Sequence, residues 1–115
     1  MNVTIEQEID MFASITKDMV EVFSRKRHDY GQTSTETYKK FGPISMYLRM
    51  YDKMGRLENL FVRGAENLVG EAIEDTLLDL ANYAIITIIE KRKAEAEMKA
   101  NEVREKREAS ELRMR

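Results

Sequence analysis

The chain has 115 residues, of which 43% are hydrophobic and 35% are charged, with a formal net charge of -2. This length predicts one domain, and the slightly acidic balance argues against a dedicated nucleic-acid binder, which would carry a basic surface. With no cysteine and a single histidine, His28, the sequence excludes disulfides, thiol nucleophiles, zinc-thiolate sites and two-histidine metal motifs.

No membrane or export segment is expected. The first ten residues are acidic and lack the apolar core of a signal peptide. The longest apolar run, 83–89, is interrupted by Thr87 and is far shorter than a membrane span. The sequence therefore predicts a cytoplasmic protein.

The first predicted helix begins after Thr4, which forms a capping-box pattern with Gln7. Large apolar residues then recur at helical spacing: Ile5, Ile9, Phe12, Ile15, Met19, Val22 and Phe23. This helix is expected to end near Gly31. The stretch 31–42 (GQTSTETYKKFG) is rich in Ser, Thr and Gly, and it predicts a loop.

Proline and glycine mark the remaining helices. Pro43 suits the first position of a second helix, which should continue to about Arg63 and be capped by Gly64. A third helix should begin near Val69 or Gly70 and run past Glu90, since no later residue stops it. No alternating strand pattern occurs. The prediction is an all-α bundle of three main helices, the third extended at the C-terminus.

The third helix is apolar around much of its circumference. Ile73, Leu77, Leu80, Ala81, Ala84 and Ile88 form one face, and Leu78, Ile85 and Ile89 form a second face beside it. Three helices can hardly surround such a helix. We therefore expect a homo-oligomer, most simply a dimer, in which this helix meets its copies.

The composition changes at Lys91 to Lys, Arg, Glu and Ala, which divides the chain into a domain over 1–90 and a charged helical tail over 91–115. The tail contains favourable i,i+4 pairs such as Glu95 with Lys99, and it has no apolar heptad seam. It is interpreted as a solvated extension, with an arm for a partner or nucleic acid as the alternative.

Two predicted helices carry facing charged stripes, each about 80° wide at 100° per residue. On the second helix the stripe consists of Arg49, Asp52, Arg56, Asn59 and Arg63, with Lys53 beside it. On the third helix it consists of Glu71, Asp75, Asp79 and Asn82. Acids stacked at i,i+4 repel one another, so a positive charge must compensate them.

Two explanations of the stripes remain open. In the first, the arginines pair with the acids as a structural salt-bridge ladder. In the second, Mg²⁺ binds the acids and holds nucleotide phosphates, with Arg49, Lys53 and Arg56 contacting phosphate oxygens. Asn82 fits either account, because its amide can orient a carboxylate or contact a base.

Three sequence runs resemble a known family. KRHDYG at 26–31, RMYDKMGRLENL at 49–60 and EAIEDTLLDLANYAI at 71–85 are similar to the phage and bacterial nucleotide modification associated domain family. They resemble, more distantly, the all-α nucleoside triphosphate pyrophosphatases of the MazG and dimeric dUTPase kind. The resemblance covers about residues 20–90 and leaves out the tail.

The resemblance implies site residues. In MazG-like enzymes, two acidic motifs bind Mg²⁺ that activates water for attack on a nucleotide phosphate. Transferred to this chain, they correspond to Asp52, Glu71, Asp75 and Asp79, although Arg56 stands where those enzymes have a further acid. In the resembled family the DYG segment lies beside the charged helices. Lys26, Asp29 and Tyr30 would then contact the nucleotide, the alternative for Asp29 and Tyr30 being helix termination.

Three functions follow as hypotheses. The first is a Mg²⁺-dependent nucleoside triphosphate pyrophosphohydrolase of phage or bacterial nucleotide metabolism. The second is a non-catalytic nucleotide binder that sequesters a signalling nucleotide, as a phage anti-defence protein in an infected host cell would do. The third is a purely structural helical oligomer.

Overall fold

The computed structural model describes residues 2–30, 33–64 and 70–114; for residues 29, 30 and 70–72 it describes the backbone alone. Within these ranges every regular element is helical, which confirms the all-α prediction. The prediction of three main helices is corrected, because the described residues form four: α1 (Ile5–Tyr30), α2 (Thr33–Phe41), α3 (Ile44–Leu57) and α4 (Gly70–Arg113).

The start of α1 follows from its capping box. The backbone N–H of Thr4 donates to Gln7 Oε1 at 2.8 Å, and the N–H of Gln7 donates to Thr4 Oγ1 at 3.1 Å. Two of the amides that a helix start leaves unsatisfied are thereby bonded. The predicted N-terminus of the first helix is confirmed, and its end at Tyr30 matches the expected stop near Gly31.

Helix α2 occupies most of the stretch predicted as a loop, so that prediction was wrong. Threonine and serine have low helix propensity, but propensity is a weak prior that tertiary contacts override. Here Thr35 is buried, and its side chain is hydrogen-bonded to α4. Gly42, with φ +78°, ends the helix, and its N–H donates to the Tyr38 carbonyl at 2.7 Å.

Helix α3 follows Pro43 directly, as the fixed φ of proline favours. Its last turn widens into a short π-helix, η1 (Glu58–Val62), in which the N–H of Arg63 donates to the Glu58 carbonyl at 3.1 Å. Gly64 then takes φ +61°, a left-handed conformation that glycine adopts without strain. The predicted end of the second helix at Arg63 and Gly64 is thus confirmed.

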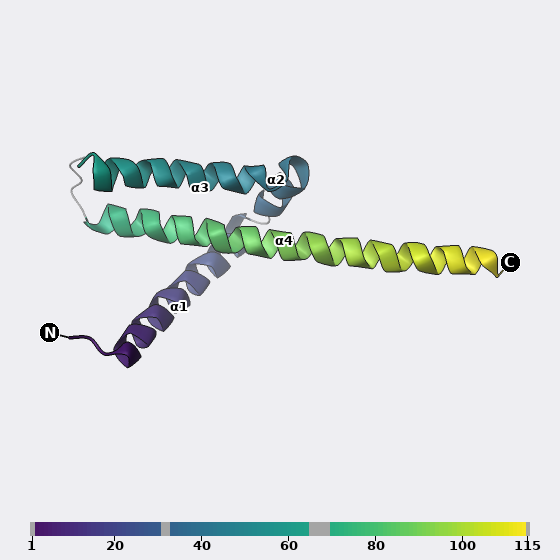
Figure 1. Ribbon diagram of the computed structural model, residues 1–115, viewed down its shortest axis with the longest axis horizontal. Helices are drawn as coiled ribbons and strands as arrows, with labels where there is room; N and C mark the ends of the chain where they lie inside the picture. Colours follow the sequence, from purple (N-terminus) through teal and green to yellow (C-terminus); the bar gives the residue numbers. More distant parts are fainter. Residues whose placement is uncertain (1, 31–32, 65–69, 115) are drawn as a thin grey trace.

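Helix α4 is continuous over 44 residues, as the absence of a stop signal predicted. Helix α3 runs antiparallel beside its first half, α1 crosses it, and its C-terminal half extends alone beyond the other helices (Figure 1). The molecule is consequently elongated, with extents of 74 × 34 × 26 Å. None of the helices described combines the length and the apolar character that crossing a membrane requires.

The core of the single chain is small. Among the described residues, the buried hydrophobic side chains are Met46, Leu57 and Ile86, from the contact between α3 and α4. The faces of α4 that were expected to be surrounded are only partly covered, because Leu77, Ile85 and Ile88 are exposed. The other helices of the chain therefore leave part of the apolar surface of α4 uncovered.

Candidate functional site

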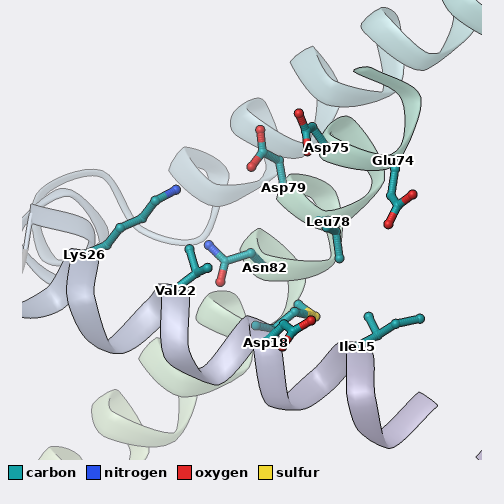
Figure 2. Close-up of a pocket in the computed structure, with 10 residues that line it drawn as sticks. Ile15, Asp18, Val22, Lys26, Glu74, Asp75, Leu78, Asp79 and Asn82 are labelled. Atoms are coloured by element: carbon teal, nitrogen blue, oxygen red, sulfur yellow. The ribbon is translucent and has the colours of Figure 1, made fainter. Parts of the chain in front are cut away.

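A groove of about 420 Å³ lies between α1 and α4 (Figure 2). This volume falls in the range of small-molecule sites. Among the described residues, its lining comes from these two helices: Ile15, Asp18, Met19, Val22 and Lys26 on α1, and Glu74, Asp75, Leu78, Asp79 and Asn82 on α4.

The α4 wall of the groove is acidic. Asp75 and Asp79 are four residues apart and project from successive turns on the same side of the helix (Figure 2). The ammonium group of Lys53 on α3 lies 3.2 Å from the Asp79 carboxylate and compensates part of this charge. Both side chains are only partly buried, so solvent still reaches the pair.

The α1 wall is mainly apolar and ends in one cation. Ile15, Met19, Val22 and Lys26 recur at intervals of three and four residues, which places them on one face of α1. In Figure 2 Lys26 extends from α1 along the groove, and the Asn82 amide points from α4 toward α1. The groove therefore combines an apolar surface with a few polar groups, the usual composition of a ligand site.

A smaller cavity of about 150 Å³ adjoins the groove and shares Lys26 and Asn82 with it. The remaining lining residues are Phe23, Arg27, Thr33, Ser34, Tyr83 and Ile86. The guanidinium of Arg49 lies over the Tyr83 ring, 5.8 Å from its centroid, a cation–π contact between α3 and α4. This end of the site is cationic and aromatic, whereas the other end is acidic.

The structure brings together only some of the predicted site residues. Lys26, Asp75, Asp79 and Asn82 share the groove, and Lys53 reaches it through Asp79. Asp52 and Arg56 are exposed on α3 and do not line it. The side chains of Asp29, Tyr30 and Glu71, all predicted to be in the site, lie outside the described residues.

Two acids of the groove, Asp18 and Glu74, were missed by sequence reasoning. Asp18 lies next to Met19 on the apolar side of α1, but nothing in the sequence states which face of α1 meets α4. Across the described side chains, no three histidine or acidic groups lie close enough together to hold one metal ion. Any cation here would therefore take one or two carboxylates from those residues and complete its shell with water or ligand oxygens.

The predicted salt-bridge ladder is also limited. In the described part of the stripes, the ion pair between α3 and α4 is that of Lys53 with Asp79, and neither Arg49 nor Arg56 is paired with an acid of α4. Arg63 lies 3.9 Å from Glu58 on its own helical segment. Arg49 and Arg56 of α3 therefore form no ion pair with the described acids of α4.

Comparison with protein families shows which family the chain belongs to. The model of nucleotide modification associated domain 1 matches residues 26–90, more than half of the chain. The chain belongs to this family. No curated protein and no solved structure gave a significant match. The region that matches the nucleotide modification associated domain contains the α4 wall of the groove and Lys26. Asp18 precedes this region, and the tail follows it.

The last residue of the family region, Glu90, is the centre of a buried polar cluster that sequence reasoning missed. Glu90 is 2% exposed, and its Oε1 accepts a 2.7 Å hydrogen bond from the Thr35 hydroxyl. Arg27 and Lys93 each place a nitrogen 3.4 Å from the same oxygen. Periodicity could not indicate this role, because Glu90 lies one turn after buried Ile86, and Ile86 belongs to neither of the predicted apolar faces of α4.

This cluster connects three helices. Arg27 belongs to α1, Thr35 to α2, and Glu90 and Lys93 to α4. Arg27 also stacks on Phe23 of its own helix, with 5.0 Å between the guanidinium carbon and the ring centroid. Because Lys26 is the neighbour of Arg27, the cluster fixes the end of α1 that carries the cation of the groove.

Proposed function

We propose that this protein binds a nucleotide in the groove between α1 and α4, with a divalent cation such as Mg²⁺ between the acidic wall and the phosphates. The observation that carries the proposal is the groove itself: an apolar wall of α1 faces paired carboxylates of α4. Those carboxylates and Lys26 lie in the region that matches the nucleotide modification associated domain. The more distant resemblance of the three sequence runs to MazG-type pyrophosphatases would imply the same ligand class, because those enzymes act on nucleotides.

The charge of the groove supports a cation-dependent ligand. Four carboxylates line it, those of Asp18, Glu74, Asp75 and Asp79, against one lining ammonium group, that of Lys26, and the Lys53 ammonium paired with Asp79. A phosphate alone would be repelled by this excess of negative charge. Mg²⁺ is commonly held by one or two carboxylates together with substrate phosphates, and Asp75 and Asp79 could supply these carboxylates.

The opposite wall suits a base or sugar. Ile15, Met19 and Val22 offer apolar contact area, and Leu78 adds to it from α4. The Asn82 amide supplies both a donor and acceptors, so it can hydrogen-bond to a base edge. Lys26, between the groove and the smaller cavity, can neutralise a phosphate oxygen through a charge-assisted hydrogen bond.

Hydrolysis of the bound nucleotide is the second candidate function. It is favoured by the number of acids in the groove, because carboxylates that are not needed for a cation could accept a proton from an attacking water. In this reading the protein is a Mg²⁺-dependent pyrophosphohydrolase; without turnover it is a nucleotide binder that sequesters its ligand. We also propose that the protein works as a homo-oligomer, which the exposed apolar residues of α4 support.

The test is binding of a panel of linear and cyclic nucleotides, measured by calorimetry with and without Mg²⁺. We expect binding with Mg²⁺, and binding at least about tenfold weaker after Lys26→Met, a loss typical of one charge-assisted hydrogen bond. Lys17→Met is the matched control, since Lys17 is an exposed lysine of the same helix that does not line the groove.

Chromatography of the recovered ligand separates the two candidates. Pyrophosphate and monophosphate products that disappear with Asp75→Asn would establish hydrolysis, whereas intact ligand would establish sequestration. Failure of every nucleotide to bind, at concentrations up to the millimolar range, would refute the proposal. An equal effect of the Lys17 and Lys26 variants would move the site away from this groove.

A further inference from the structure

The first half of α1 is an uncovered amphipathic helix. Every residue from Ile5 to Ile15 is exposed, although this stretch is fully helical. Its large apolar residues gather on one side at 100° per residue, and we name them the α1 stripe: Ile5, Ile9, Phe12 and Ile15. Ile5 and Phe12 are both 71% exposed. Figure 1 shows this half of α1 extending away from α4.

In proteins, most of the stability of a helix comes from tertiary packing of its amphipathic face, and nothing in the described part of the chain packs on this part of α1. Burying one large aliphatic or aromatic side chain stabilises by roughly 1.5–3 kcal/mol. The α1 stripe contains four such side chains, so covering it would contribute more than the capping box and the i,i+4 pairs of this segment. The sequence pattern of α1 thus predicts that another surface covers these side chains. The single chain does not provide that surface.

Helix α4 carries an exposed apolar stripe of similar length. Leu77, Ala84 and Ile88 fall within about 40° of one another on the helix and are all exposed; we name them the α4 stripe. At 1.5 Å per residue the α4 stripe is about 17 Å long, and the α1 stripe is about 15 Å long. Each stripe could therefore cover the other along its whole length.

The total surface indicates what kind of partner is missing. The chain exposes 9792 Å², whereas a folded monomer of its mass is expected to expose about 6500 Å². The difference, about 3300 Å², exceeds the roughly 800 Å² that each partner of a stable complex buries. The charged tail accounts for part of the excess, yet most of the exposed large hydrophobics precede it.

We infer that the α1 stripe of one copy packs on the α4 stripe of a second copy, and that the reciprocal contact closes a two-fold dimer. Each chain carries both stripes, so the contact of α1 in one copy with α4 in the other can form twice, related by the two-fold axis. A second copy thus covers both stripes at once. The dimer would also border the nucleotide groove, since Ile15 belongs to the α1 stripe and to the groove.

The first test is the oligomeric state of the full chain, measured by light scattering and sedimentation over a range of concentrations. We expect a dimer. Phe12→Glu should raise its dissociation constant about 100-fold, tenfold for each of the two symmetry-related contacts. Val103→Glu is the control, because Val103 is 61% exposed in the tail and lies in neither stripe. A monomeric wild-type protein, or equal effects of the two variants, would overturn the inference.

The second test locates the contact and does not depend on whether Phe12→Glu folds. The chain has no cysteine, so introduced cysteines are the only thiols. Ile9 and Ala84 lie near the middle of their stripes and should meet whichever way the helices run. Mixing Ile9→Cys with Ala84→Cys under mild oxidation should give a disulfide-linked heterodimer.

The control is a mixture of Ile9→Cys with Tyr51→Cys, since Tyr51 is exposed on α3 outside both stripes. Preferential linkage to position 51 would show that α1 packs elsewhere on the second copy and would overturn the inference. So would a disulfide within one chain of an Ile9→Cys, Ala84→Cys double variant, because it would mean that α1 folds back on its own α4. These tests need no nucleotide, so their failure would be separate from failure of the proposed function.

Discussion

The hydroxyl of Thr35 donates a 2.7 Å hydrogen bond to the carboxylate of Glu90, across 55 residues of sequence. Lys93 donates to the same hydroxyl oxygen at 2.6 Å, and Arg27 approaches the carboxylate from α1. The buried carboxylate is thus surrounded by donors, which is the condition under which a buried charge is tolerated. This contact explains both the helical state of α2 and its position against α4.

Loss of the Glu90 carboxylate should destabilise the fold. Glu90→Ala leaves the Thr35 hydroxyl and two cations without their acceptor, and we expect the free energy of unfolding to fall by about 2–3 kcal/mol. The value lies below that of a fully buried pair because the side chains of Arg27 and Lys93 are 18% and 42% exposed. Urea unfolding at fixed protein concentration measures the change.

Glu97→Ala is the matched control for Glu90→Ala. Glu97 also joins α4 to α2, through Lys39 at 3.4 Å, but both side chains are more than 60% exposed. Its removal should change stability by less than about 1 kcal/mol. Equal losses for the two variants would mean that burial of the Glu90 cluster contributes nothing.

Two glycines should respond to alanine in opposite directions. Gly42 has φ +78°, so Gly42→Ala forces a side chain into a left-handed conformation and should cost about 1 kcal/mol. Gly55 lies inside α3, where an added Cβ meets nothing within 4 Å, so Gly55→Ala should stabilise by about 0.5–1 kcal/mol. Thermal unfolding of both variants tests the pair, and a gain at Gly42 would contradict the backbone assignment.

Most helix boundaries could be predicted from local chemistry. The Thr4 capping box, Pro43 and Gly64 act within one turn of the residues concerned, so the sequence alone locates these ends. Helix α2 could not be predicted, because its Ser and Thr residues favour loops and its helical state depends on Glu90, more than fifty residues away. Contacts of this kind leave no periodic signal around α2 itself.

The site was predictable only in part for a similar reason. Helical periodicity placed Asp75, Asp79 and Asn82 on one side of α4, and all three line the groove. Periodicity does not say which helix lies opposite, and the prediction assumed α3 where the structure places α1. Asp52 was included and Asp18 was missed for this reason. The four-residue spacing predicted which residues share a face of α4, but the sequence did not predict which helix packs against that face.

Shortening the tail should separate its contacting part from its solvated part. Residues 98–113 are all exposed and helical, so a chain ending at Glu97 should keep the unfolding temperature of the intact protein within a few degrees. A chain ending at Glu90 also loses Lys93, which contacts Thr35 and Glu90, and should unfold at a lower temperature. Circular dichroism measures both, and similar losses would show that the distal tail has a structural role.

The ion pair between Lys53 and Asp79 should matter more for a ligand than for the fold. Its 3.2 Å contact is partly exposed, at 26% and 45% for the two side chains, so Lys53→Met should alter stability by less than about 1 kcal/mol. The substitution also removes a positive charge from the edge of an acidic groove, so an anionic nucleotide should bind about tenfold more weakly at low salt. Because screening reduces interactions between solvent-exposed charges, this difference should shrink as salt is raised. Calorimetric titration at two salt concentrations measures it, and a large loss of stability with unchanged nucleotide binding would assign Lys53 to the structural ladder instead.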